Sequence, residues 1–189
     1  MNSPDPIKSI DKLKQIKEYL KEENTARNYL LFVLGINSAL RISDLLGLKI
    51  KDTRKEDGSL KEHIYLRESK TSKEQKYHLS ESAKEALRYY FDEVDPNQDD
   101  WLFPSQKGGH IGRTWAWTLV SRWGNKFDVE GICSPHSLRK TYGFMARKKF
   151  DMPIELIQSK FNHSSPGVTR RYVGIAEEEI AEMDRKVSL

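Results

Sequence analysis

Five polar side chains whose chemistry suits a phosphodiester lie in the last third of the chain. In order they are His136, Arg139, His163, Arg171 and Tyr172. Ser134 is a favourable helix N-cap and Pro135 a favourable first helical residue, which predicts that His136 and Arg139 lie one turn apart on one face of a helix. A phosphate bound there would meet an imidazole, a guanidinium and the positive end of a helix together.

No single residue of this set is diagnostic, because a helical His-x-x-Arg pair arises often by chance and a tyrosine near a C-terminus is usually packing. The sequence lacks a Walker-type phosphate loop, an HExxH motif and zinc-like His/Cys spacing, and its carboxylates do not pair near the histidines. A metal-free site remains, in which arginines grip the non-bridging oxygens of a phosphate and a tyrosine attacks phosphorus to form a phosphotyrosine. A lysine can protonate the departing oxygen.

The 189 residues suffice for one domain with a real core or for two very small ones. Charged residues make up 32% of the chain and the mean hydropathy is −0.72, which is typical of charge-rich helical proteins. No apolar run approaches membrane-spanning length and the start of the chain lacks a signal peptide's apolar core, so we expect a cytoplasmic protein. The single cysteine, Cys133, excludes an internal disulfide and a cysteine-based metal cluster, and a small semi-buried side chain is favoured over a nucleophile.

The net charge of +4 and the pI near 9.0 mildly favour a polyanionic partner. Basic residues, among them Lys149 and Lys160, crowd around the candidate site, whereas acidic residues gather in 92–100 and 177–179. This segregation suits a protein that binds a phosphate backbone, although a solvated surface is the alternative. The residues expected to contact nucleic acid are Lys73, Arg147, Lys148, Arg170 and Arg171.

Hydrophobic periodicity and capping residues predict a mostly helical chain with one small β-hairpin, an α+β fold. Residues 1–10 are expected to form a disordered or extended lead-in. Residues 60–80 alternate in polarity on both sides of a polar turn, which predicts a hairpin with Lys70 near its tip. Helices are predicted after Asp11, over 26–37, from Ser80 to before Asp95, over 113–126, from Pro135, from Pro153 and over 177–186, with a turn over 162–167.

Arg41 lies in a predicted connection between two apolar helices, where an arginine must find a partner such as Asp44 or face a cleft. This stretch, SALRISDLLGLKIKD, resembles the first arginine box of the tyrosine recombinases, also called phage integrases. The segment SKTSKEQKYHLS resembles that family's hairpin, and it supplies Lys70 in the position of the family's lysine.

Two later motifs complete the resemblance to the family's catalytic domain. The family's H-x-L-R-[HK]-T box is matched by HSLRKT, with His136 and Arg139, and its last box by FNHSSPGVTRRY, with His163 and Tyr172. The resemblance covers about residues 25–185. Phe161-Asn162 stands where the family usually has Leu-Gly, and Ala39 replaces a usual glycine, so the local backbone geometry is expected to differ there.

The resemblance implies a site-specific DNA recombinase. It implies that Arg41 and Arg139 hold the scissile phosphate and that His163 donates a further hydrogen bond to it. His136 is then the general base for the nucleophile, Tyr172. Lys70 is the general acid for the 5′-hydroxyl leaving group. The 3′-phosphotyrosyl link conserves the bond energy, so the resemblance implies no cofactor, neither ATP nor a metal ion.

The resemblance also implies partners and a division of the chain. Relatives act as tetramers on double-stranded DNA, at the nucleoid, and pass a C-terminal segment to a neighbour. We therefore expect a lead-in and linker over 1–24, a catalytic domain over 25–173 and an exchanged segment over 174–189. The segment is expected to dock through Ile175, Ile180, Met183 and Val187. Two alternatives stay open: a DNA relaxer like the type IB topoisomerases, and a non-catalytic DNA-binding regulator.

Overall fold

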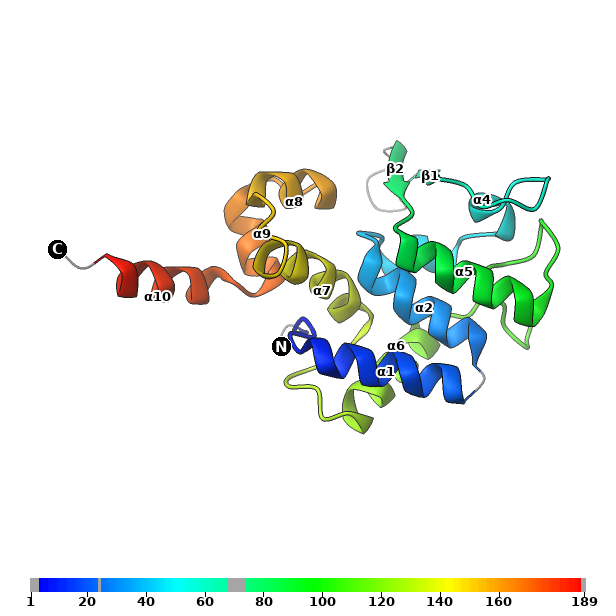
Figure 1. Cartoon of the computed structure of the whole chain (residues 1–189), viewed down its shortest axis with the longest axis horizontal. Helices are drawn as coiled ribbons and strands as arrows, with labels where there is room; N and C mark the ends of the chain where they lie inside the picture. The colour runs from blue at the N-terminus through cyan, green and yellow to red at the C-terminus, as the bar shows by residue number, and fades with distance from the viewer. Residues whose placement is uncertain (1–3, 24, 68–73, 188–189) are drawn as a thin grey trace.

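Helix α2 (Ala26–Asn37) forms the centre of the molecule, as its apolar sequence predicts. The computed structural model describes residues 4–23, 25–67 and 74–187 of the chain, and Figure 1 shows the helices gathered around α2. Residues 29–34 are all buried, and α1 (Ile10–Glu22), α5 (Glu81–Val94) and α7 (Pro135–Lys148) pack against them. A Cβ on Gly35 would come within 2.6 Å of Leu138, so this glycine lets α7 approach α2 closely.

The other elements confirm the prediction of a mostly helical chain with one small antiparallel sheet. They are α3 (Ile42–Leu46), α4 (Ile50–Thr53), β1 (His63–Arg67), β2 (Glu74–His78), α6 (Arg113–Lys126), α8 (Ile154–Phe161), α9 (Pro166–Val173) and α10 (Ala176–Lys186). Strands β1 and β2 pair with His63 opposite His78, and Ile64 faces the core. The predicted hairpin is confirmed, and its tip lies outside the described residues.

Serine side chains cap α1, α5 and α9, and the sequence prediction misplaced the start of α1 and missed α9. Helix α5 begins after Ser80, whose Oγ accepts a hydrogen bond from the backbone of Ala83 at 3.3 Å, as predicted. Helix α1 begins after Ser9, not after Asp11, because Oγ of Ser9 is placed to accept from a backbone N–H of the first turn. Helix α9 begins at Pro166, inside the stretch predicted to be a turn.

The segment before α1 is extended and packs onto the domain. The backbone N–H of Ile7 donates to Oγ1 of Thr141 at 2.8 Å, and that of Asp5 donates to the backbone oxygen of Ile132 at 3.0 Å. Ile7 is 1% exposed and belongs to the same core as α1 and α2. The N-terminal lead-in thus shares its packing with the rest of the domain.

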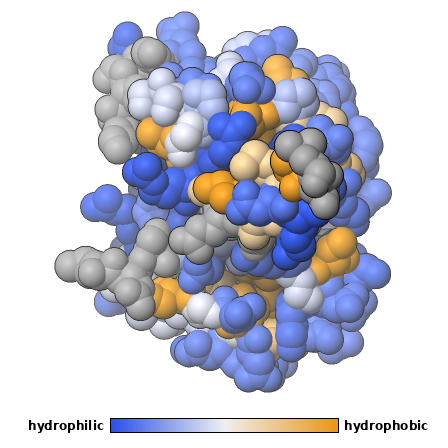
Figure 2. Space-filling model, turned by 90° about the vertical axis from the view of Figure 1, so that its left-hand side faces the viewer, coloured by the Kyte–Doolittle hydropathy of each residue, from blue (hydrophilic) through white to orange (hydrophobic). Residues whose placement is uncertain are grey.

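Helix α10 extends away from the body of the molecule, at the left of Figure 1. The face at this end is mostly hydrophilic, and its apolar residues form separate patches (Figure 2). Ile180, Met183 and Val187 are 56%, 55% and 63% exposed, whereas Ile175 is fully buried. The prediction that Ile175 belongs to an exposed docking face was therefore wrong, since this residue anchors the start of α10 in the chain's own core.

Candidate active site

Helix α7 carries the first two predicted site residues, and it starts as the sequence predicts. Ser134 is the N-cap and Pro135 the first helical residue, and the backbone N–H of Ser134 donates to Oγ of Ser137 at 3.0 Å. His136 is exposed on the first turn, and Arg139, one turn later, is 4% exposed. The start of α7 thus presents an imidazole to solvent and buries a guanidinium.

Arg139 is held by the end of α8. Its Nη2 donates to the backbone oxygen of Phe161 at 3.1 Å, and its Cζ lies 4.6 Å from the centroid of the Phe161 ring. This ring is fully buried and also lies 5.3 Å from the ring of His163 and 5.6 Å from that of Tyr172, between centroids. Phe161, which departs from the usual family pattern, is therefore the packing centre of the site.

Asn162 is the second departure, and its backbone explains why it is tolerated. It caps α8 with φ 53° and ψ 45°, in the left-handed region that favours glycine. Asparagine enters this region more readily than most side chains, so it can end a helix where glycine usually does. The chain then turns into the segment that carries His163.

His163 is fixed through its backbone and its ring. Its backbone N–H donates to the oxygen of Gln158 at 3.1 Å, and Nε2 of Gln158 donates to the oxygen of His163 at 3.1 Å. Nδ1 of His163 lies 3.1 Å from Oγ1 of Thr169, a fully buried residue of α9. The Thr169 hydroxyl also donates to the backbone oxygen of Ser165 at 3.3 Å, so its oxygen can accept from Nδ1–H of His163, and this contact orients the imidazole ring.

Tyr172 lies on the last turns of α9, with its ring edge-on to His163 at 4.9 Å between centroids. Burial raises the pKa of the Tyr172 phenol above its ordinary value, whereas the charge of Arg139, a hydrogen bond with it and the charge of Arg41 act to lower that pKa. Both arginines therefore act on the same phenol. Because it is neutral near pH 7, the phenol needs a base and an anion-stabilising field to become a nucleophile.

Arg41 reaches this site from the first quarter of the chain. It is the residue before the first turn of α3 and lies in the connection that follows α2, as the sequence predicts. Its positive charge acts to lower the pKa of the Tyr172 phenol on α9. Segments that are far apart in sequence thus direct positive charge at one hydroxyl.

The β-hairpin borders the site through Lys160. Nζ of Lys160 lies 4.7 Å from the ring centroid of Tyr77 in β2. Burial lowers the pKa of Lys160, and the charge of Arg139 lowers it further, so the hairpin and Arg139 approach the same side chain. Lys70 and Lys73, the two hairpin lysines in the predicted set, lie outside the described residues.

A glycine allows the site helices to pack. A Cβ on Gly143 in α7 would come within 2.5 Å of Cγ1 of Val173 and 2.8 Å of the Phe161 ring. Helix α7 is therefore in close contact with α8 and α9 where they carry the histidine and the tyrosine. This contact lets α9, which carries Tyr172, approach α7, which carries Arg139.

Three cations predicted to contact nucleic acid are paired with α10. Nε of Arg147 donates to Oε1 of Glu179 at 2.7 Å, and Nε of Arg170 donates to Oε2 of the same residue at 3.0 Å. Nζ of Lys148 lies 3.5 Å from Glu182. The expectation that residues 177–179 sit apart from the basic cluster was therefore wrong for Glu179, because the first turns of α10 lie against α7 and α9. Arg171 is exposed, and DNA contact by these cations stays a prediction.

Sequence reasoning missed Lys140, whereas it favoured packing over a nucleophilic role for Cys133. Nζ of Lys140 lies 5.2 Å from the ring centroid of Tyr172, and its position directly after Arg139 was the available signal. Cys133 is 8% exposed, and burial raises the pKa of its thiol to about 11, against a hydrogen bond with Ser137 that lowers it. Such a thiol is a poor nucleophile, as the interpretation of Cys133 as packing requires.

The structure describes residues 4–23, 25–67 and 74–187. Within these ranges no three His, Cys, Asp or Glu side chains are grouped to hold a metal ion. In the same part of the chain, none of the helices combines the length and apolar character that crossing a membrane requires.

Taken together, the helical fold places the Tyr172 ring beside His163, and the charges of Arg139 and Arg41 act on its phenol. Residues 9–179 match the model of the phage integrase family, and the chain belongs to this family. It is 38% identical over 179 residues to the probable integrase/recombinase YoeC of Bacillus subtilis, covering 94% of this chain and 93% of that protein. It is 26% identical over 153 residues to the tyrosine recombinase XerD of Chlorobaculum tepidum, covering 78% of this chain and 48% of that protein.

Solved structures share the fold. The crystal structure of XerA recombinase matches with a TM-score of 0.74 at 22% identity, covering 100% of this chain and 66% of that one. A post-cleavage complex of XerH site-specific recombinase bound to palindromic difH substrate matches with a TM-score of 0.72 at 22% identity. This match covers 98% of this chain and 54% of the XerH chain. The chain spans nearly all of the Bacillus relative but about half of XerD and XerH.

Proposed function

We propose that the chain is a site-specific DNA recombinase that cuts and rejoins DNA through a 3′-phosphotyrosyl intermediate. The observation that carries this proposal is the position of Tyr172. Its ring lies 4.9 Å from that of His163 and 5.6 Å from that of Phe161, the ring on which Arg139 packs, and the charges of Arg139 and Arg41 act on its phenol. An anion at this point has two guanidinium groups to neutralise it. Family membership and the XerH complex with its difH substrate favour double-stranded DNA as the source of that anion.

In the reaction, the Tyr172 oxygen forms a bond to phosphorus as the bond from phosphorus to the 5′ oxygen breaks. His136 accepts the phenol proton, and Lys70 donates a proton to the departing 5′ oxygen. Arg41 and Arg139 stabilise the charge that grows on the non-bridging oxygens, and His163 donates a hydrogen bond to one of them. The 5′-hydroxyl of a partner strand then attacks the phosphotyrosine and reverses the chemistry. A DNA target also leads us to expect the protein at the nucleoid.

The first test is covalent trapping on a nicked suicide substrate made from the protein's own target DNA. Wild-type protein is expected to form an adduct that survives denaturing electrophoresis, and to do so in EDTA, whereas Tyr172→Phe forms none and binds DNA with the wild-type Kd. A wild-type protein that binds this DNA but never forms the adduct would favour the non-catalytic regulator. Relaxation of supercoiled DNA by a monomer without strand exchange would favour the topoisomerase-like alternative.

The exposed face of α10 supports exchange of the C-terminal segment between copies. Ile180, Met183 and Val187 are exposed on a helix that extends away from the body of the molecule (Figure 1). A solvent-exposed apolar face of this kind is expected to be covered in an assembly. We propose that a second copy of the chain covers it and that the DNA-bound form is a tetramer.

The same chain presents a groove that fits this helix. It lies between α1 and the last turns of α7, has a volume of about 480 Å³ and is lined by Ile10, Leu13, Met145, Phe150 and Met152, with Lys14, Lys17 and Lys149 among its charged residues. Phe150 is 60% exposed, so its ring is available to a partner. Asp184 lies beside the apolar face of α10, and its charge complements the lysines.

Assembly tests this pairing. Either Met183→Asp on the helix or Phe150→Asp in the groove is expected to reduce the DNA-bound tetramer to smaller species in sedimentation, because each buries a charge in an apolar contact. The control is Val94→Asp, an exposed apolar residue at the end of α5. A tetramer that survives both site variants would contradict the proposed contact without affecting the cleavage assay.

A further inference from the structure

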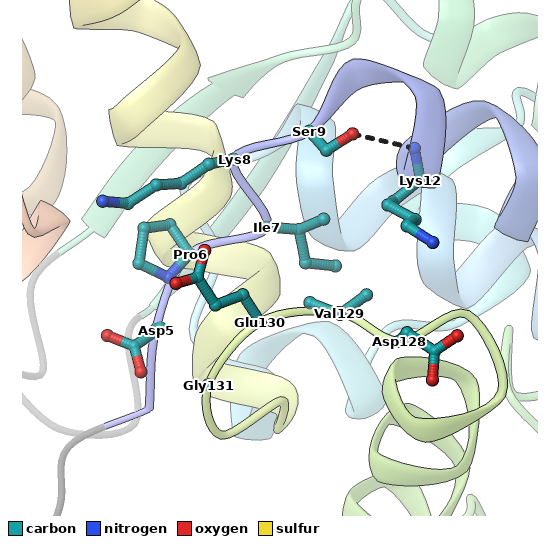
Figure 3. Close-up of a pocket in the computed structure, with 10 residues that line it drawn as sticks. All are labelled: Asp5, Pro6, Ile7, Lys8, Ser9, Lys12, Asp128, Val129, Glu130 and Gly131. Atoms are coloured by element: carbon teal, nitrogen blue, oxygen red, sulfur yellow. Dashed lines mark hydrogen bonds between the residues drawn. The ribbon is translucent and has the colours of Figure 1, made fainter.

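The N-terminal segment 4–8 lies beside the candidate active site. Figure 3 shows it running between the 128–131 loop and α7, where Asp5, Pro6, Ile7 and Lys8 line a pocket with that loop. Two backbone hydrogen bonds fix it, from Asp5 to Ile132 at 3.0 Å and from Ile7 to Thr141 at 2.8 Å. The segment is therefore held against the helix that carries Arg139.

Lys140 joins this segment to the tyrosine. Its Nζ donates to the backbone oxygen of Pro4 at 2.6 Å and lies 5.2 Å from the centroid of the Tyr172 ring. The side chain is 6% exposed. A buried ammonium is costly unless polar or aromatic groups surround it, and a carbonyl oxygen and a ring face are both suitable. Burial lowers the pKa of Lys140, and the charge of Asp5 opposes that shift.

The segment also reaches the turn that follows the tyrosine. Gly174 ends α9 with φ 74°, and a Cβ placed on it would lie 3.5 Å from Cδ of Pro6. The next residue, Ile175, is fully buried. The N-terminal segment thus touches α9 at its end and, through Lys140, at the ring of Tyr172.

We propose that Lys140 is a positioning residue for Tyr172, and that segment 4–8 acts through it to hold the nucleophile beside Arg139. The inference rests on the proposed function, since it assigns a role in the same cleavage step. The ammonium, tethered to Pro4, limits how far the ring can swing about its Cα–Cβ bond. The phenol therefore keeps the position in which the hydrogen bond with Arg139 forms. Lys140 itself need not touch DNA.

The test compares Lys140→Met with Lys140→Arg in the full chain. Methionine keeps the length and loses the charge, so single-turnover adduct formation is expected to fall about tenfold while the Kd for target DNA stays the same. Arginine can donate to a carbonyl and stack on a ring, so it is expected to restore most of the rate. A lysine with a merely structural role would not lower the adduct rate while leaving the Kd for DNA unchanged, and arginine would not restore that rate.

The matched control is Lys126→Met. Nζ of Lys126 lies 4.6 Å from the ring of Tyr19, so this variant also removes a lysine–aromatic contact, but on α6 and away from the site. It is expected to leave the adduct rate unchanged. The proposal would be overturned if Lys140→Met cleaved DNA at the wild-type rate. It would also be overturned if both Lys140 variants lost cleavage rate, DNA affinity and melting temperature to the same extent.

A measurement without DNA separates this inference from the proposed function. In protein labelled with ring-¹³C tyrosine, the Tyr172 resonance is identified by its absence in Tyr172→Phe. Lys140→Met is expected to shift this resonance and Lys126→Met to leave it in place. An unmoved Tyr172 resonance would overturn the inference even if cleavage proceeds, whereas a shifted resonance in a protein that never forms an adduct would contradict the proposed function alone.

Discussion

Replacing Glu179 by glutamine is expected to loosen α10 while leaving the rest of the domain folded. Glu179 is 19% exposed and accepts from Arg147 of α7 at 2.7 Å and from Arg170 of α9 at 3.0 Å. Apart from the buried Ile175, these are the contacts that join α10 to the body of the domain most directly. The glutamine keeps the shape of the side chain and removes its charge.

The size of the effect follows from the exposure of the partners. A hydrogen bond to a charged group contributes about 1.5–3 kcal/mol when well shielded, and exposed pairs contribute less than about 1 kcal/mol. The side chains of Arg147 and Arg170 are 30% and 39% exposed, so both bonds must be discounted for solvent screening. A total of about 1–2 kcal/mol remains, which raises the population of detached α10 about tenfold.

Hydrogen exchange measures that population. Amides in residues 180–187 of Glu179→Gln are expected to exchange about ten times faster than in wild type, with α2 and α7 unchanged. Glu182→Gln is the matched control, because Glu182 is 45% exposed and its bonds to Lys148 and Lys186 are screened. Equal exchange of α10 in wild type and Glu179→Gln, or equal acceleration in both variants, would refute the reasoning.

The pH dependence supplies an independent check on the same residue. Burial acts to raise the pKa of Glu179, but the hydrogen bonds and charges of Arg147 and Arg170 outweigh it, so the pKa lies below its ordinary value of 4.5. A lowered carboxyl pKa contributes stability that is complete above the unfolded value and is lost as the pH falls through the folded pKa. Detachment of α10 is therefore expected to be constant near neutral pH and to increase in acid, and Glu179→Gln should lack this increase.

Two further predictions concern packing and reactivity. Gly143→Ala is expected to destabilise the protein by about 1–2 kcal/mol, because its Cβ would meet Val173 and Phe161, whereas Gly167→Ala, whose Cβ would meet nothing closer than 3.9 Å, should be neutral in thermal denaturation. Cys133, with a pKa of about 11, is expected to resist iodoacetamide at pH 8 in the folded protein and to react after unfolding, as mass spectrometry can show. Rapid alkylation of the folded protein would contradict the buried position of this thiol.

Local signals predicted much of the fold and most members of the site. Helices α2, α5, α6 and α7 lie where apolar periodicity and N-caps indicated, because each signal resides within a few residues of the feature that it controls. The pair His136 and Arg139 follows from the Ser134-Pro135 start of α7 in the same way. Each motif of the family could be recognised because it lies within a short stretch of sequence. Nothing within such a stretch shows that the motifs come together in the folded protein.

Contacts between distant segments were not predictable from the same signals. The bond between Lys140 and Pro4 spans 136 residues, and that between Ile7 and Thr141 spans 134. Residues 1–10, with two prolines, were therefore predicted to be a lead-in. Ile7 lies there outside any helical or strand pattern of apolar residues that would have marked it as part of the core. The use of Phe161 as the packing centre was hidden for a similar reason, because its neighbours come from α7 and α9 as well as from the adjoining turn.

The basic residues near Tyr172 show why charge density alone cannot identify a DNA surface. Arg147 follows Arg139 by eight residues in one helix, a rise of about 12 Å, so it lies well away from a phosphate held by Arg139. Its carboxylate partner comes 32 residues later, in a helix that the proposed assembly would give to another copy. Moving α10 away would remove Glu179 from Arg147 and Arg170 in the same step. Detachment of the helix and release of two cations would therefore be one event, which favours a DNA-bound form in which phosphates replace the carboxylate.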